Sequence, residues 1–298
     1  MNFIGEIAGL ATSFFYAVSA FIFSKAGRTI GSMVTNRVRL TIALIYLIIL
    51  NLILFHEPLP FSAGNSRWMW LGISGIIGLA LGDVFLFQAY ISIGTRLGVL
   101  LLSLAPIFGS LISWIFFEET LTILQITGIV LALAGIAWVV LSHEEPADTP
   151  HGHTRRGVLF GVLAGLGQAT GLVLAKQGMT GDLSPFQGNA IRMLAAATFI
   201  WLWTAVAGQT GATVETVRKH PKVLGLIALG AVAGPLLGVS ASLLAVQHAE
   251  VGVASTLMAL PPVIVLPISY FVFKEKVGWQ AVAGTLLAIV GVAVLFLA

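Results

Sequence analysis

The segment MWLGISGIIGLALGDVFLFQAYI, residues 69–91, is a long apolar run with a single charged residue, Asp83. A helix needs about 20 predominantly apolar residues to cross the hydrocarbon core of a bilayer, so this segment predicts a membrane span. Nine further segments of similar character occur along the chain. The ten predicted spans are 3–24, 38–55, 69–91, 98–117, 123–141, 157–176, 189–208, 222–247, 252–273 and 278–298.

The composition of the whole chain indicates an integral membrane protein. Hydrophobic residues make up 58% of the 298 residues and charged residues 9%, with a mean hydropathy of +1.00, whereas a typical globular protein is roughly one quarter charged. A net charge of +3 scattered between apolar runs forms no basic stripe for nucleic acid. Zero cysteines exclude disulfides and thiolate metal sites. The runs are continuous rather than alternating, which favours an all-α polytopic fold over a barrel.

One long polar stretch, residues 142–156 (SHEEPADTPHGHTRR), divides the chain into parts of nearly equal size. Its His143, His151 and His153 are of a residue type that can bind a metal ion. Proline and acidic residues in the same stretch oppose a fixed ligand cage, so a solvated linker is the favoured interpretation. The sequence predicts no metal site and no cofactor.

The two parts, residues 1–141 and 157–298, are copies of one another. A shift of 156 residues superimposes glycines, alanines, prolines and glutamates, and shifts of 153 and 151 superimpose residues near the first two spans. The matched pairs include Gly78 with Gly234, Gly82 with Gly238, Ala89 with Ala245, Pro106 with Pro262, Glu119 with Glu275, Asn36 with Asn189, Arg39 with Arg192 and Lys25 with Lys176. Each copy has five spans, an odd number, so the second copy enters the membrane from the opposite side. Inverted repeats of this kind recur in secondary transporters around a central site.

The layout resembles the EamA family of the drug/metabolite transporter superfamily over essentially the whole chain. Four paired features carry the resemblance: Lys25 and Lys176 close the first spans, Arg39 and Arg192 open the second, Pro106 and Pro262 lie in the fourth, and Glu119 and Glu275 precede the fifth. The resemblance implies ten helices in two inverted five-helix units, a central cavity between them and export of small metabolites such as amino acids. The second copy has Gln247, His248 and Glu250 where the first copy has uncharged residues, which opposes equal roles for the two copies.

Asp83 is the strongest candidate for a functional residue. It lies roughly 20 Å into its span at about 1.5 Å per residue. A carboxylate at that depth costs roughly 2.5 to 3.5 kcal/mol on insertion scales and usually faces a cavity or a partner. We expect it to accept a proton or to balance an ammonium group of the substrate, with a buried structural pair as the alternative. Phe87 and Tyr90 follow on the same helix face and are expected to form an aromatic wall.

Polar residues on otherwise apolar spans are further candidates for a cavity. Spacings of three, four or seven align them on one face, although hydroxyl groups in membrane helices often bond only to their own backbone. The expected cavity or coupling residues are Asp83, Tyr16, Phe87, Tyr90, Ser103, Pro106, Ser110, Trp114, Gln168 and Pro262, with Thr12, Ser19 and Thr170 aligned beside them. The prolines belong to this set because each removes a backbone donor and kinks or loosens the fourth span of its copy.

The charged residues near span ends have simpler interpretations. The long side chains of Lys25, Lys176, Arg39 and Arg192 are expected to reach the headgroups as interface anchors. The two glutamates that precede the fifth spans are expected to cap the helices that follow them.

Small residues spaced by four predict where helices pack, because in lipid helices associate where their backbones can approach closely. Four such stripes occur. They are Gly5, Gly9 and Ser13; Ser74, Gly78 and Gly82; Gly157, Gly161 and Gly165; and Gly230, Gly234 and Gly238.

Together these features predict a secondary active transporter in the plasma membrane that moves a small polar or amphipathic metabolite outward by alternating access. The expected partners are the substrate, the lipid bilayer and the proton as coupling ion, with the protein a monomer or homodimer.

Two other classes of function are considered. A lipid flippase, the nearer alternative, would bind acyl or prenyl chains and open laterally between helices. A membrane-embedded enzyme is remote: the string ALGD at residues 80–83 faintly resembles an intramembrane protease loop, but that chemistry needs a second carboxylate. The other aspartates, Asp148 and Asp182, lie in the linker and a loop.

Overall fold

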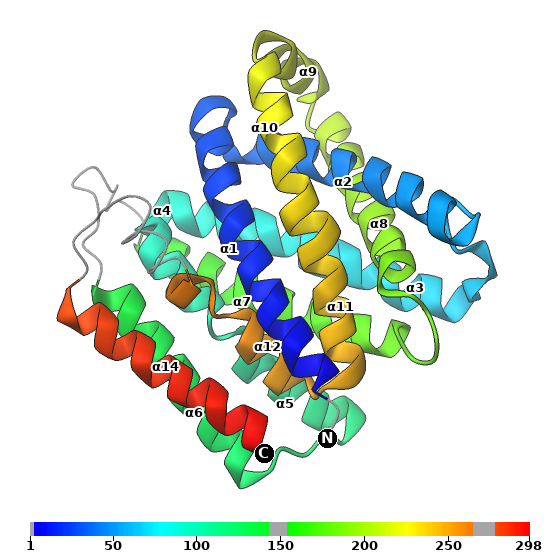
Figure 1. Cartoon of the computed structure of the whole chain (residues 1–298). Coiled ribbons are helices and arrows are strands. Elements are labelled where there is room, and N and C mark those ends of the chain that lie inside the picture. The colour runs from blue at the N-terminus through cyan, green and yellow to red at the C-terminus, as the bar shows by residue number, and fades with distance from the viewer. Residues whose placement is uncertain (1–2, 143–153, 265–277) are drawn as a thin grey trace.

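The computed structural model describes residues 3–142, 154–264 and 278–298, and in these ranges the chain consists of helices joined by turns and short links (Figure 1). Nine helices of the described part are long and apolar enough to cross a membrane, and Val251–Ile264 forms a shorter apolar helix. The predicted all-α polytopic fold of about ten spans is therefore confirmed. The three histidines of the linker, His143, His151 and His153, and Glu275 lie outside the described residues.

The first half contains five spans, and its third span is built from three consecutive pieces. That span ends at Gly94, where φ is 83°, a left-handed conformation that glycine adopts without strain. The elements are α1 (Ile4–Ile30), α2 (Ser32–Phe55), η1 (Phe61–Ala63), α3 (Asn65–Ser74), η2 (Gly75–Leu81), α4 (Gly82–Leu102), α5 (Ala105–Phe117) and α6 (Ile123–Ser142).

The second half repeats this order with one additional helix. Its elements are α7 (Thr154–Gly178), α8 (Pro185–Val206), α9 (Thr210–Lys219), α10 (Pro221–Ala231), η3 (Val232–Gly238), α11 (Val239–His248), α12 (Val251–Met258) and α14 (Trp279–Leu297). The added helix, α9, lies in what the sequence predicts as a loop. Arg37 holds it to the start of α2, since its guanidinium donates to Oγ1 of Thr213 at 2.7 Å and to Oε1 of Gln209 at 2.6 Å.

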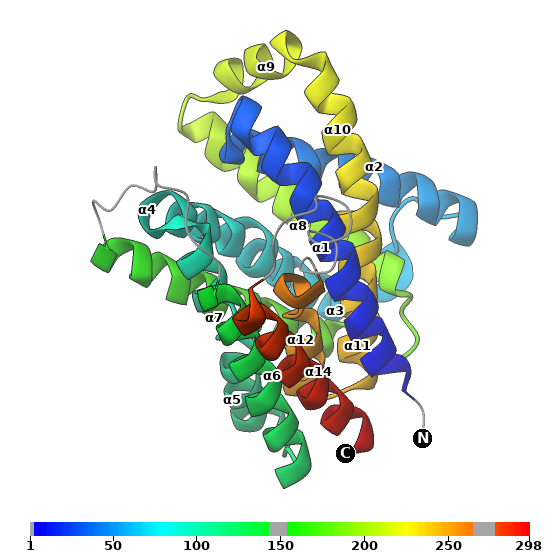
Figure 2. The same ribbon diagram turned by 60° about the vertical axis from the view of Figure 1, so that its left-hand side comes forward.

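The fifth helices of the two halves, α6 and α14, pack side by side along a seam of small residues (Figures 1 and 2). A Cβ atom added to Gly135 would collide with the backbone of Ala288, and one added to Gly291 would collide with the backbone of Ala132. Successive contacts therefore join later residues of α6 to earlier residues of α14. Such close backbone approach is the expected way for helices to associate in lipid.

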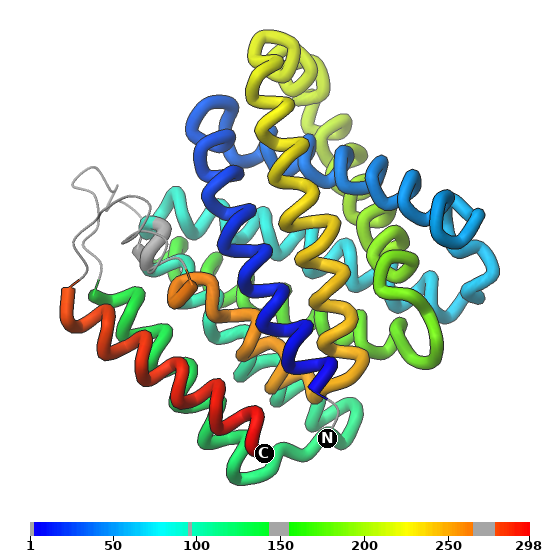
Figure 3. The backbone as a smooth tube through the Cα atoms, viewed as in Figure 1, coloured from blue at the N-terminus to red at the C-terminus, as the bar shows by residue number. Residues whose placement is uncertain are grey.

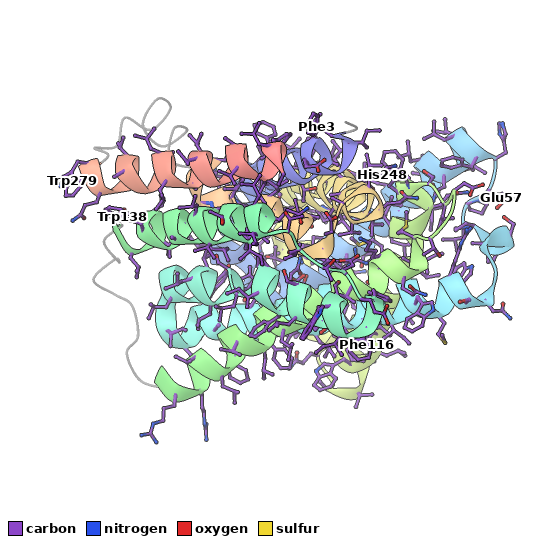
Figure 4. All side chains as sticks on the ribbon, turned by 90° about the horizontal axis from the view of Figure 1, so that it is seen from below. Phe3, Glu57, Phe116, Trp138, His248 and Trp279 are labelled. Atoms are coloured by element: carbon purple, nitrogen blue, oxygen red, sulfur yellow. The ribbon has the colours of Figure 1, made fainter. Side chains whose placement is uncertain are left out.

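The two helices of this pair run in opposite directions. Trp138, near the end of α6, and Trp279, at the start of α14, lie at the same end of the pair (Figure 4). Because α6 and α14 occupy equivalent places in the two copies, their antiparallel packing is the direction that an inverted repeat requires.

The first helix of each half packs against the third span of the other half. Helix α1 lies beside the continuous rod of α10, η3 and α11 (Figure 3), and α7 lies beside α3, η2 and α4. A Cβ on Gly171 of α7 would lie 2.8 Å from Cα of Gly78, and one on Gly234 of η3 would lie 2.8 Å from Cβ of Ser19 in α1. The predicted packing role of the small-residue stripes is confirmed at these contacts.

The middle of each third span is wound as a π-helix. The two π segments, η2 and η3, occupy nearly equivalent places in the two copies. π-bulges are rare and often lie at functional sites. In η2, Gly75 lets α8 come close, since a Cβ there would lie 2.8 Å from Cα of Arg192. In η3, Pro235 removes one backbone donor.

Each fourth span is broken just before its matched proline. The span Leu97–Phe117 is interrupted at residues 103–104, and Pro106 lies in the first turn of α5. In the second half, residues 259–260 separate α12 from a helical turn that contains Pro262. A proline in the first turn of a helix lacks only an amide hydrogen that has no intrahelical partner anyway. The prolines therefore start new helical segments after a break, so each fourth span is loosened next to its proline rather than kinked within a continuous helix.

We expect Gly135→Ala to destabilise the protein and Gly225→Ala to leave its stability nearly unchanged. The methyl group at residue 135 would force α6 and α14 apart, and overpacking of this kind costs about 1–3 kcal/mol. Gly225 lies in α10 with nothing within 4 Å of an added Cβ, and alanine favours a helix over glycine. Thermal unfolding of both purified variants in detergent measures the difference. Equal unfolding midpoints for the two variants would contradict the close packing of α6 against α14 at Gly135.

Candidate functional site

An ion pair lies inside the membrane-spanning part of the first half. Arg39 of α2 donates from Nη2 to Oδ2 of Asp83 in α4, and both side chains are 18% exposed. The Nε of Arg39 donates to Oδ1 of Asn36 at 2.8 Å, and its guanidinium carbon lies 5.4 Å from the centroid of the Phe23 ring. The charge of Arg39 is thus met by a carboxylate, an amide oxygen and an aromatic face.

Groups from four helices surround Asp83. Tyr16 of α1, Tyr90 of α4 and Arg192 of α8 lie within electrostatic range of its carboxylate. We call these five residues (Tyr16, Arg39, Asp83, Tyr90 and Arg192) the central cluster. The structure therefore brings together three of the residues that the sequence predicts for a cavity, and joins to them two arginines that it does not.

Two more predicted residues lie next to the central cluster. The ring of Phe87 packs edge-on against Tyr90, with centroids 6.3 Å apart. Helix α7 passes beside the residue before Asp83, since a Cβ on Gly82 would lie 3.7 Å from the backbone N of Gln168. The aromatic pair and α7 thus border the carboxylate, and their role in a cavity stays a prediction.

Arg192 is the buried counterpart of Arg39 in the second half. It is 3% exposed, and its Nε is buried without a hydrogen-bond partner. A Cβ on Gly78 would lie 3.4 Å from its Nη2, so the guanidinium reaches η2 of the first half. The expectation that Arg39 and Arg192 anchor the protein at the membrane surface is wrong, because both side chains extend inward to groups on other helices.

Asn189 stabilises the π segment of the second half. Its Nδ2 donates to the carbonyl O of Pro235 at 2.8 Å and to Oγ of Ser240 at 2.9 Å. These bonds fasten α8 to η3 and to the start of α11. The sequence matches Asn189 with Asn36 but indicates no role for either; the pairing of two polar residues inside apolar spans was the available signal.

The candidates of the first half's fourth span form a separate group. The hydroxyls of Ser103 and Ser110 donate to the carbonyls of Val99 and Pro106, at 3.0 and 2.8 Å, four residues earlier in the chain. Trp114 is 59% exposed. These side chains are accounted for by local bonds and by exposure, so their part in a cavity stays a prediction.

A second polar cluster lies where α7 and α11 end and α12 begins. Lys176 forms an ion pair with Glu119 and donates to the carbonyl O of Ala249 at 2.8 Å. Oε2 of Glu119 accepts from the backbone N–H of Val251 at 3.1 Å. Glu119 therefore caps α12 of the other half, and the expectation that it caps the helix that follows it, α6, is wrong.

Helix α6 has its own cap, which explains why Glu119 is free to reach α12. The backbone N–H of Gln125 donates to Oγ1 of Thr122 at 3.1 Å, and the N–H of Thr122 donates to Oε1 of Gln125 at 2.8 Å. This reciprocal pair is a capping box.

Two hollows lie away from the central cluster. A polar one of about 450 Å³ is lined by Glu119, Lys176 and the polar residues in which the second copy departs from the first, Gln247, His248 and Glu250. An apolar one of about 340 Å³ lies between α3, η2 and α8. Its lining includes Trp68, Ile76, Ile191, Leu194 and Phe199.

Comparison with known proteins identifies a family, a curated relative and a solved structure with the same fold. The profile of the EamA-like transporter family matches residues 3–141 and again residues 155–297. A protein of Pseudomonas paraeruginosa (strain DSM 24068 / PA7), the probable 4-amino-4-deoxy-L-arabinose-phosphoundecaprenol flippase subunit ArnE, is 43% identical over 93 residues, which is 31% of this chain and 74% of the relative. A crystal structure of another protein has the same fold, with a TM-score of 0.74 and 17% identity over 98% of this chain and 97% of the other.

We expect Arg39→Gln and Asp83→Asn each to destabilise the protein more than the two substitutions together. Each single change leaves a charge without its partner in a medium of low dielectric constant, at a cost on the order of 3 kcal/mol, whereas the double change removes both charges. A double-mutant cycle of thermal unfolding measures the coupling. Additive effects of the two changes would show that the ion pair contributes nothing to stability.

We expect Glu119→Gln to lower the unfolding midpoint and Glu215→Gln to change it little. Glu119 accepts charge-assisted bonds from two other segments while only 16% exposed, and losing such bonds costs about 1–3 kcal/mol. Glu215 forms an ion pair with Lys219 in which both side chains are 66% exposed, and such surface pairs contribute little. Equal midpoints of the two variants would contradict the capping role.

Proposed function

The chain belongs to the EamA-like transporter family, and from that membership we propose that it is a secondary active transporter that exports a small metabolite by alternating access. It is a multi-pass membrane protein. The proposed location is the plasma membrane, where it works as a monomer or homodimer. The proposed cargo is a small polar or amphipathic solute, with amino acids as the class that the family resemblance suggests.

The observation that carries this proposal is the central cluster. Its residues come from α1, α2 and α4 of the first half and from α8 of the second half. Ionisable residues within membrane spans are costly, and they usually face a cavity or mark the path of a substrate or ion. A solute held at this cluster would contact both halves, which is the requirement for a site that opens to either side.

The packing between the halves suits a change of mutual orientation. The first helix of each half meets the third span of the other half along seams of glycine and serine. Such seams have few interlocking side chains, so helices can slide along them in the manner of shear motions. The breaks before Pro106 and Pro262 supply points at which the fourth spans can bend.

We propose the proton as the coupling ion, with Asp83 as the group that binds it. A proton on Asp83 would remove the charge that holds Arg39, so that proton binding opens the ion pair. Opening of the pair would change the groups presented to a solute by α2 and α4. Proton binding and solute binding would then be linked at one place.

A lipid flippase is the second candidate, and two observations favour it. The Pseudomonas relative carries the name of a flippase subunit. The apolar hollow between α3, η2 and α8 has the lining that an acyl or prenyl chain would need. Its position beside Ile191 and Leu194 places it on the helix that also carries Arg192.

We expect Asp83→Asn to remove the dependence of transport on a pH gradient. The substrate is first chosen by a thermal-shift screen of amino acids, nucleosides, cations and lipids, and uptake is then measured in proteoliposomes with and without an imposed gradient. Uptake by the variant should fall to the rate seen without a gradient, because the group that takes up the proton is gone. Full uptake with unchanged pH dependence would exclude Asp83 from coupling.

Two controls separate coupling from folding and from lipid transport. The double variant Arg39→Gln, Asp83→Asn removes both charges of the ion pair, so its uptake should also lack gradient dependence while its fold is retained. Asp182→Asn, at an exposed loop position, should behave as wild type. Movement of a fluorescent lipid between leaflets, with no transport of any soluble solute, would favour the flippase instead.

A further inference from the structure

The two halves differ at the carboxylate of the central cluster. The shift of 156 residues that matches Gly82 with Gly238 places Asp83 on Val239. The arginine of the first half therefore has a carboxylate in its own half, whereas Arg192 has a valine at the matching position. This asymmetry breaks a repeat that is otherwise kept at both arginines and at both asparagines of the second spans.

Among the described residues, no carboxylate at contact distance from Arg192 replaces the missing one. Its Nε is buried without a hydrogen-bond partner, and within residues 3–142, 154–264 and 278–298 its guanidinium forms no ion pair at contact distance. Arg39, in contrast, pairs with a carboxylate, an amide oxygen and a ring. Two arginines at matching positions of one repeat thus differ: Arg39 forms a contact ion pair with Asp83, whereas Arg192 lies only within electrostatic range of that carboxylate.

The charges of the central cluster do not balance. Arg39 and Arg192 carry two positive charges, and Asp83 carries one negative charge, so one positive charge is in excess. A buried ion without a partner is strongly disfavoured, and removing a partner from a buried pair is among the costliest changes to a protein. The excess charge lies on Arg192, which is 3% exposed, and an anion from outside the chain would relieve it.

The surroundings of Arg192 are suited to hold such an anion. Gly78 faces its Nη2 and bears no side chain. Tyr16 lies within electrostatic range of Arg192, so a phenol hydroxyl is near the guanidinium. A planar guanidinium binds a carboxylate or phosphate through two parallel N–H···O bonds, which fixes orientation as well as charge.

We propose that Arg192 binds an anionic group, a carboxylate or a phosphate, of the solute that this protein transports. The proposal rests on the transporter function and names the chemistry of its substrate: the solute supplies the carboxylate that the second half lacks at Val239. The anion has two sources to distinguish, a free metabolite or the headgroup of an anionic lipid. The lipid is included because an apolar hollow borders α8, the helix that carries Arg192.

The test is binding of defined anions to the purified full chain in nanodiscs of phosphatidylcholine. The probes are glutamate, succinate and inorganic phosphate, compared at equal ionic strength with sodium chloride, choline and glucose. At a hundredfold excess over Kd, at least one of the three anions should raise the unfolding midpoint by about 5 °C or more. A second arm adds phosphatidylglycerol to the nanodiscs in place of the soluble anions.

Variants of Arg192 and Val239 test whether the anion binds at Arg192. Arg192→Gln should abolish the shift, and Arg192→Lys should retain part of it because the charge remains. Val239→Asp should also abolish the shift while Arg192 is intact, because it restores an internal carboxylate at the matching position. Val239→Asn is its control, with nearly the same shape and no charge, and should still bind the anion.

The outcomes distinguish a free metabolite, a lipid headgroup and the absence of an anion site. A shift from a soluble anion that Arg192→Gln removes supports a free metabolite, and a shift that needs phosphatidylglycerol and is removed by the same variant supports a lipid headgroup. A wild type that no anion stabilises, or a shift that survives in Arg192→Gln, overturns the proposal. Should Val239→Asp fail to fold, the two Arg192 variants decide alone. Because no gradient is applied, anion binding without transport would count against the transporter function and not against the anion site.

Discussion

A charge buried among membrane helices must have a partner, and this constraint organises the core of the molecule. The Arg39–Asp83 ion pair satisfies it in the first half by joining α2 to α4. Lys176 and Glu119 satisfy it near the helix ends by joining the two halves. Among the described residues, Arg192 is the charged member of the central cluster without a contact ion pair, and its Nε is buried without a hydrogen-bond partner. The rule that explains the pairs therefore supports a ligand at Arg192.

The two copies share most of their packing and their irregular features, and they differ at a few polar positions. Antiparallel packing of α6 with α14, and of each first helix with the opposite third span, follows from two copies inserted in opposite directions. Even the irregular features recur, since both third spans contain a π segment and both fourth spans break before a proline. Where the copies diverge, at Asp83 against Val239 and in Gln247, His248 and Glu250, polar groups gather at the central cluster or at the polar hollow.

Part of the candidate site can be predicted from the sequence. Asp83 stands out because a carboxylate is rare in an apolar run, and helical spacing places Tyr90 on the same side of the span. The position of Arg39 and Arg192 near the ends of apolar windows predicts them at the membrane surface. The helices extend further than those windows, since α2 begins at Ser32 and α8 at Pro185, and the extra turns move both arginines inside the bundle.

Local composition and spacing determine the approximate number and the order of the spans, the duplication and the small-residue seams. The sequence alone therefore suffices to predict these features. The partners of the charged groups cannot be predicted in this way. Arg39 and Asp83 are 44 residues apart, and Glu119 meets the N–H of Val251 across 132 residues. Pairing at such separations depends on how helices lie in space, and only the assembled bundle shows that one of two matched arginines forms a contact ion pair and the other does not.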